Sequence, residues 1–269
     1  MPQGYIGFSA DHKTHQYGVP GFSLENKSFQ KSYLDSLPVS VQTQQNRFVL
    51  DALWKPEFAL QQVQFKAAQI NNRSGEFIGA KNANQYRFTT QQAEITAKHQ
   101  PFKLNKSYQL TGEIGAILSN RSVSGQGNLK YLPDVKSHTT AFFIQEKLDF
   151  DRIYLDAGYR TEQVKHEVQA QNFKLSRNAV NTVLQDQNFD LNSFSLGTGM
   201  YVTNFLELKA KYTESERAPE INELYSSNPH YSVMAQAEGD QNLKTEKLKD
   251  TELTAILLND QTRLSEMAP

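Results

Sequence analysis

The sequence contains no cysteine, which excludes disulfide bonds, thiolate metal sites and cysteine nucleophiles. It also lacks any run of about 18 apolar residues, so no transmembrane helix is expected. The net charge is −1, and without a broad basic surface we expect no nucleic-acid partner. The Gly-x-Ser-x-Gly, Walker and His-Glu-x-x-His motifs are all missing, so the sequence does not indicate an enzyme.

Hydrophobic residues make up only 38% of the chain, yet aromatic residues reach 11%. This combination is typical of a wide transmembrane β-barrel, in which half of each strand faces water and the loops are hydrophilic. Such a protein must be exported, but Met1–Gly4 runs into a strand-like segment without a signal peptide. We therefore expect a chain that begins at an internal cut, or a gene that has lost its beginning.

Alternation of apolar and polar residues is the main structural signal. A period of two over many residues predicts β-strands with one apolar face. On the segment 107–119, for example, one face carries Tyr108, Leu110, Gly112, Ile114, Ala116 and Leu118. The strands predicted in this way lie near residues 4–10, 46–55, 60–70, 85–98, 107–119, 138–149, 152–165, 190–202, 205–213 and 248–258.

The connections between these segments alternate between short and long. Short ones lie near Pro56, Asn105, Asp151 and Thr203, and long ones span residues 11–45, 71–84, 120–137, 166–189 and 214–247. Outer-membrane barrels have brief periplasmic turns and extended outer loops. The predicted fold class is therefore all-β, an antiparallel transmembrane β-barrel.

Aromatic residues stand on both sides of every predicted short turn. Amphipathic rings concentrate at the headgroup level of a membrane and form girdles there, although aromatic residues also favour strand ends in general. The bracketing pairs are Trp54 and Phe58, Phe102 and Tyr108, Phe150 and Tyr154, and Tyr201 and Phe205.

The loop 214–247 carries a recognisable pattern. Its parts are Arg-x-Pro-x-x-x-Glu-Leu-Tyr, an Asn-Pro-His triplet, and Glu-Gly-Asp-x-x-Leu-x-x-Glu. The pattern resembles the barrel signature of TonB-dependent outer-membrane receptors, and the resemblance runs from about residue 4 to residue 258. The matching residues are Arg217, Pro219, Glu223, Leu224, Tyr225, His230, Glu238, Gly239, Leu243 and Glu246.

Two interpretations of this loop follow from its residues. Pro219 is suited to begin a short helical turn with Ile221, Leu224 and Tyr225 on its apolar side. Such a loop folds back and packs on the barrel wall. The alternative is direct contact with cargo.

The opening residues, Gly4–Gly7 and Gln16–Gly21, resemble an early strand and outer loop of the zinc- and haem-uptake (ZnuD-type) branch. The resemblance implies a monomeric 22-stranded barrel in outer-membrane lipid, filled by a plug domain. It also implies energy supplied by the TonB-ExbB-ExbD system of the inner membrane. Zinc, haem or a ferric siderophore would be cargo, and no cofactor is required.

About ten strands are under half of such a barrel, so residues 1–258 are expected to be a partial barrel that is inactive alone, and residues 259–269 a tail unlike the family. Two other functions stay open. One is a complete small barrel acting as a passive pore or adhesin, since an even strand number permits closure. The other is a soluble β protein that binds a ligand or carbohydrate.

Candidate metal ligands are Asp11, His12 and His15 in the first predicted long loop, joined by His230 from another outer loop. Carboxylate and neutral imidazole both suit zinc, although a histidine pair in a polar loop is more often merely solvated. Residues 21–45 contain no histidine, whereas zinc receptors of the family often carry a His/Asp-rich insertion there. A haem cargo would need an axial ligand, for which His230, Tyr225 and Tyr231 are candidates.

Overall fold

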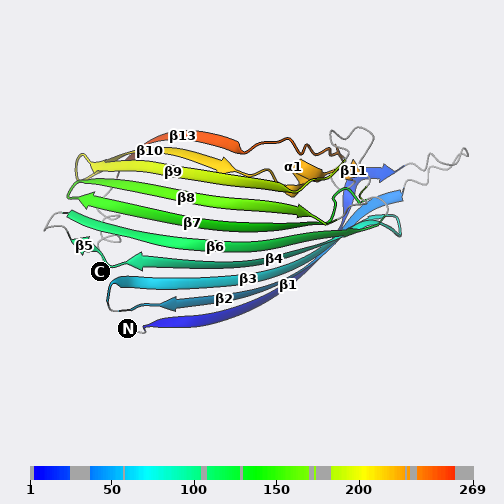
Figure 1. The fold of residues 1–269 in the computed structure, drawn as a ribbon, viewed down its shortest axis with the longest axis horizontal. Helices are drawn as coiled ribbons and strands as arrows, with labels where there is room; N and C mark the ends of the chain where they lie inside the picture. The colour runs from blue at the N-terminus through cyan, green and yellow to red at the C-terminus, as the bar shows by residue number, and fades with distance from the viewer. Residues whose placement is uncertain are drawn as a thin grey trace, which may run out of the picture.

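The computed structural model describes residues 3–24, 37–56, 58–103, 108–127, 130–169, 173, 183–227, 229–230 and 235–257. Eleven described strands form one antiparallel sheet, and two short strands form a second, small sheet. The strands of the main sheet follow one another in sequence order, except that one short strand pairs beside this path. No helix among the described residues is long and apolar enough to cross a membrane. The all-β class predicted from the sequence is confirmed (Figure 1).

The sheet consists of β1 (Gly4–Leu24), β2 (Leu37–Trp54), β3 (Leu60–Ile78), β4 (Lys81–His99), β5 (Phe102–Lys103), β6 (Tyr108–Gln126), β7 (Val135–Phe150), β8 (Ile153–Val168), β9 (Gln187–Tyr201), β10 (Leu206–Arg217) and β13 (Glu246–Leu257). Between β10 and β13 lie α1 (Ile221–Tyr225), β11 (Pro229–His230) and β12 (Ala235–Gln236). These three elements lie at the end of the sheet opposite the N-terminus (Figure 1).

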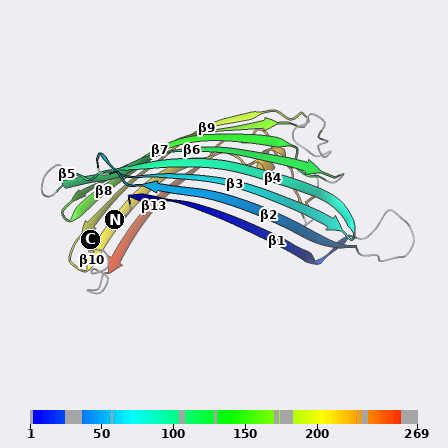
Figure 2. The same cartoon turned by 90° about the horizontal axis from the view of Figure 1, so that it is seen from below.

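The main sheet is curved and stays open (Figure 2). Its two edge strands are β1 and β13, which do not pair with each other among the described residues. A complete small barrel would pair its first and last strands. The observed sheet therefore has the form of a segment of a barrel wall, and the alternative of a self-contained ten-stranded barrel is not favoured.

Several strands extend much further than the alternation predicted. β1 continues to Leu24 and β3 to Ile78, so the segments 11–45 and 71–84 are largely strand and the prediction of long loops there was wrong. The outward residues change from apolar to polar at His12, while backbone pairing continues, as in the register His12 to Asn46. Without an apolar face, the period of two could no longer be read.

The predicted short turns at Pro56, Asp151 and Thr203 are confirmed, and Asn105 lies outside the described residues. Asp151 and Arg152 connect β7 to β8, and Asp151 adopts a left-handed φ of 52°, a conformation that Asp tolerates in tight turns. The rings of Trp54 and Phe58 pack together with their centroids 6.2 Å apart. Tyr108, in contrast, contacts Phe150 of the neighbouring strand at 5.1 Å.

The two faces of the sheet differ in polarity. Outward residues near the middle of the strands are apolar and exposed, for example Ile114 at 55%, Phe142 at 56% and Leu196 at 57%. The opposite, inward face carries cross-strand neighbours such as Lys66 and Glu94. A continuous exposed apolar belt of this kind faces lipid rather than water.

Buried side chains concentrate on the inward face, at the outer end of the strands. Tyr86, Val123 and Val135 of the sheet pack with Leu224 and Tyr225 of α1, and all five are at most 2% exposed. This core attaches the loop that follows β10 to the inner wall.

Candidate functional site

The segment from Arg217 to Glu246, here called the motif loop, turns inward from β10 and lies on the inner wall. Contacts to β8, to β6 and to the connection between β6 and β7 hold its described residues. The Pro219 carbonyl oxygen lies 3.3 Å from His166 of β8, Glu220 pairs with Arg121 of β6, and the Ser227 N–H donates to the Tyr131 carbonyl.

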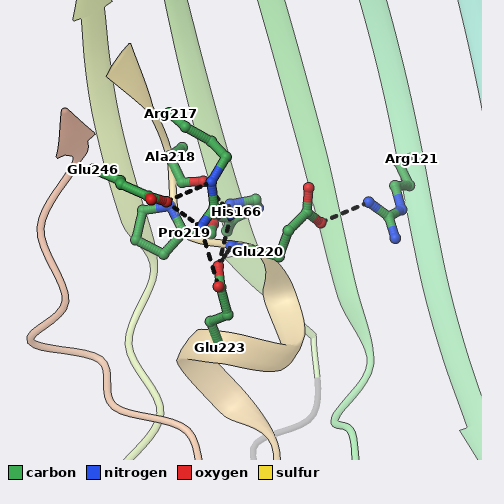
Figure 3. Close-up of polar contacts among 8 residues, drawn as sticks. All are labelled: Arg121, His166, Arg217, Ala218, Pro219, Glu220, Glu223 and Glu246. Atoms are coloured by element: carbon green, nitrogen blue, oxygen red, sulfur yellow. Dashed lines mark hydrogen bonds and ion pairs between the residues drawn. The ribbon is translucent and has the colours of Figure 1, made fainter. Parts of the chain in front are cut away.

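Arg217 holds two carboxylates at once (Figure 3). Its Nη1 and Nη2 donate to the two oxygens of Glu223 at 2.9 and 3.1 Å. Its Nε and Nη2 donate to Oε2 of Glu246 at 2.9 and 2.6 Å. A planar guanidinium suits such paired contacts, so one side chain connects the end of β10 to α1 and to the start of β13. These contacts of Arg217 with Glu223 and Glu246 are here called the Arg217 clamp.

Glu223 also closes the start of α1. Its Oε2 accepts a hydrogen bond from the Glu220 N–H at 2.7 Å, and the reciprocal contact completes a capping box. The hydrogen bonds from Arg217 and from the Glu220 N–H hold the pKa of the Glu223 carboxyl below its usual range. Glu223 is therefore charged at neutral pH and takes part in both the clamp and the cap.

Gly239 lies directly against α1. A Cβ at this position would stand 2.5 Å from the carbonyl carbon of Leu224 and the backbone nitrogen of Tyr225. Because of this close approach, the Gly239 N–H reaches the Ser226 carbonyl at 2.7 Å, and the Asp240 N–H reaches the Glu223 carbonyl at 2.9 Å. Glycine is required here by the contact between two backbones.

The apolar side of α1 faces the wall, as its pattern predicted. Leu224 and Tyr225 are each 1% exposed. The Tyr225 hydroxyl donates to the Gln185 carbonyl at 2.8 Å, and burial raises the pKa of this hydroxyl. The Tyr225 oxygen is therefore engaged with the segment that precedes β9 rather than directed at a cargo.

Two wall residues that hold the motif loop were missed from the sequence. His166 donates from Nε2 to the Pro219 carbonyl, and the Ser137 hydroxyl lies 2.7 Å from its Nδ1. Arg121 lies 2.9 Å from Glu220. Both were assigned to long loops, whereas the alternation through Val164 and Val123 continues to them and places them on the inward face.

His230 packs on the inner wall as well. Its ring stacks on Tyr131 with the centroids 4.0 Å apart, and its Nε2 lies 3.2 Å from Oε1 of Glu76. The other oxygen of Glu76 accepts a hydrogen bond from Asn84 at 2.6 Å. Burial raises the pKa of Tyr131, so an uncharged ring lies beside the imidazole.

The first group of proposed metal ligands lies on β1 rather than in a loop. Alternation along a strand places His12 on the outward face and His15 on the inward face. His12 donates from Nδ1 to Asn46 at 2.7 Å, and Asp11 lies 3.7 Å from Lys13. Among the described residues, no group of three or more His, Asp or Glu able to hold a metal ion was found.

The remaining motif residues line the path from α1 to β13. Glu238 is exposed, Leu243 is 39% exposed, and the Leu243 N–H lies 3.3 Å from the Asp240 carbonyl. Gln241 accepts from the Gln185 N–H at 2.6 Å and donates to the Val183 carbonyl at 2.9 Å. Tyr231 lies outside the described residues.

Comparison with known proteins places this geometry in a family context. A family model described as "TonB dependent receptor-like, beta-barrel" matches residues 3–265. The hemoglobin and hemoglobin-haptoglobin-binding protein of Haemophilus ducreyi is 26% identical over 165 residues, covering 49% of this chain. The TonB-dependent heme receptor A of Haemophilus influenzae is 24% identical over 129 residues, covering 47% of this chain. The matched segments span only 16% and 17% of these two relatives.

Solved structures show the same fold. One is the hemophore receptor HasR of Serratia marcescens, solved as a double mutant in complex with its hemophore HasA and heme. The match covers 95% of this chain and 40% of the HasR chain, with a TM-score of 0.65 and 14% identity. The FrpB iron transporter of Neisseria meningitidis matches 96% of this chain and 41% of its own, with a TM-score of 0.67 and 15% identity. At these identities, the likeness concerns the fold alone.

Proposed function

The chain belongs to the TonB-dependent receptor-like β-barrel family, whose members are outer-membrane proteins, and we propose that it forms part of the barrel wall of a receptor for the energised uptake of a metal complex. The observation that carries this proposal is the motif loop, which the Arg217 clamp and α1 attach to the inward face at the outer end of the strands.

Among possible cargoes, we propose haem first. The two relatives described above are named as haemoglobin-binding and haem receptors, which supports an iron source containing haem. A zinc cargo of the ZnuD-type branch has less support, because His12 and His15 are directed to opposite faces and His230 is engaged with Glu76. Ferric siderophores are the third candidate, and TonB-ExbB-ExbD is the proposed energy-supplying partner of a monomeric receptor.

Growth assays separate these candidates. The complete receptor gene that contains this segment is expressed in a host lacking its own haem, siderophore and zinc receptors. We expect growth with haem as the sole iron source, and loss of that growth when the host's TonB is deleted. Equal growth with and without TonB would contradict energised uptake. Growth only with a siderophore or with limiting zinc would leave the receptor proposal intact and replace the cargo.

A further inference from the structure

Two arginines lie directly opposite each other on the outward face. Arg73 of β3 is in register with Arg87 of β4, and both side chains are exposed. Like charges placed directly opposite on neighbouring strands destabilise a sheet unless something neutralises them. Among the described residues, no carboxylate forms an ion pair with either arginine.

The surroundings of this pair are polar but uncharged, apart from one histidine. Near this pair, the outward residues of β1 to β4 include no acidic side chain and are mostly polar: His12, Thr14, Gln16, Gln42, Gln44, Asn46, Gln69, Asn71, Arg73, Gln85, Arg87, Thr89 and Gln91. Phe77, near the end of β3, is an apolar residue on the same face. A hollow of about 410 Å³ includes both arginines together with Gln44, Asn46, Asn71 and Thr89. Amide and hydroxyl groups around two guanidinium groups suit an anion that accepts several hydrogen bonds.

Outward lysines elsewhere on the sheet have acidic partners. Lys247 lies 2.6 Å from Glu216, and Lys249 lies 2.9 Å from Glu214. The strands β10 and β13 therefore neutralise their outward cations within the protein. Arg73 and Arg87 differ because no described carboxylate forms an ion pair with them.

The height of the arginine pair indicates what supplies that charge. Arg73 is six residues beyond Ala67, an apolar outward residue of the belt on β3. Six residues span about 20 Å along a strand, or roughly 14 Å above the belt at a tilt of about 45°. The headgroup layer of a phospholipid leaflet is only about 5–8 Å thick. The pair therefore stands above phospholipid headgroups, at the level of a taller headgroup.

We propose that Arg73 and Arg87 bind a phosphate carried on the sugars of a phosphorylated glycolipid, the lipopolysaccharide of the outer leaflet. Planar guanidinium groups bind phosphate in two-pronged geometry, and basic clusters next to a membrane recognise anionic lipid headgroups. The neighbouring amides of Asn71 and Gln44 lie in the same hollow and are placed to hydrogen-bond the sugar. This surface is outside the barrel and is separate from cargo uptake.

The test measures lipopolysaccharide binding by the complete receptor that contains this chain, purified in detergent. The probes are lipopolysaccharide, lipopolysaccharide from which the sugar phosphates have been removed, and inorganic phosphate. For the double variant Arg73→Gln/Arg87→Gln, we expect affinity for lipopolysaccharide to fall about tenfold or more, because charge-assisted hydrogen bonds are lost. The wild-type receptor should show a similar loss with the dephosphorylated probe, and inorganic phosphate should compete only weakly.

The matched control is Lys247→Gln/Lys249→Gln, which removes two outward cations that have carboxylate partners. It should leave binding unchanged. Arg73→Lys/Arg87→Lys keeps the positive charges but removes the planar guanidinium groups, so it should lose part of the affinity. This variant still tests the proposal if the glutamine variant does not fold. Equal binding of the dephosphorylated probe, or undiminished binding by the glutamine variant, would overturn the proposal. Inorganic phosphate that binds as tightly as lipopolysaccharide would overturn the glycolipid as its source.

Discussion

Arg217 and Glu223 form a two-pronged ion pair, with Nη1 to Oε2 at 2.9 Å and Nη2 to Oε1 at 3.1 Å. The pair connects the last residue of β10 to the third residue of α1. The same carboxylate caps α1 through the Glu220 N–H. The direction of the chain as it leaves the barrel wall therefore depends on this contact.

Replacing Glu223 by Gln removes the charge from both the clamp and the cap. Because the side chain is 37% exposed, solvent screens the ion pair, and we expect a loss of about 1–2 kcal/mol in the local stability of the loop. Limited proteolysis of the folded receptor should then cleave faster within 218–227. Glu252→Gln, at an exposed carboxylate on β13, is the control and should cleave at the wild-type rate. Unchanged cleavage of Glu223→Gln would remove the clamp from this description.

Acidification should open the same contact. The folded-state pKa of Glu223 is lowered, so its contribution is present above the ordinary value of 4.5 and is lost as the pH falls through the lower folded value. Hydrogen exchange at 221–226 should therefore accelerate below about pH 4.5 beyond the intrinsic rate. In Glu223→Gln this additional dependence should disappear. An identical pH profile in both proteins would show that another group controls the opening.

Gly239→Ala tests the close contact between the loop and α1. The added Cβ would meet backbone atoms of Leu224 and Tyr225 at 2.5 Å, so the loop must move, at a cost of about 1–3 kcal/mol. Chemical denaturation of the receptor in lipid vesicles measures this cost. Gly7→Ala is the matched control, since its Cβ would meet no atom closer than 3.7 Å. Equal stability of the two variants would contradict the close packing of Gly239.

Tyr86→Phe removes the acceptor for two backbone donors. The Tyr86 hydroxyl oxygen accepts from the N–H groups of Tyr131 and Leu132 at 2.6 and 2.9 Å, and the side chain is only 2% exposed. Leaving buried donors unpaired should cost about 2 kcal/mol in the free energy of unfolding. Tyr159→Phe, which loses one exposed hydrogen bond to Asn192, should cost less than about 1 kcal/mol. Equal costs would show that the Tyr86 hydroxyl is not structural.

The sequence was sufficient for the membrane-facing part of the fold. The alternation from Tyr108 to Leu118 coincides with β6, because lipid imposes a strict apolar pattern on the outward face. The turn at Asp151 could be predicted because tight turns favour a few residue types, including Asp. The ends of the strands could not be predicted. Beyond His12 the outward residues face a polar layer, so β1 continues to Leu24 without an apolar period.

The motif loop was only partly predictable. Pro219 and the apolar side of α1 were sufficient for a helical turn packed on the wall. Its partners His166 and Arg121 come from β8 and β6. Alternation gives the face on which each lies, but no local pattern specifies which wall residues a distant loop contacts. His12 and His15 were expected in one loop. They lie instead on β1, where alternation places them on opposite faces.

The orientation of the sheet toward lipid is the central claim, and one measurement tests it most directly. Because the chain has no cysteine, single cysteines can be introduced at positions 113, 114, 116, 117, 118 and 119 of β6 in the membrane-embedded receptor. We expect a lipid-soluble quencher to reach fluorescent labels at Ile114, Ala116 and Leu118, and a water-soluble quencher to reach those at Glu113, Ile117 and Ser119. Equal access of the water-soluble quencher to both sets would contradict a transmembrane barrel wall.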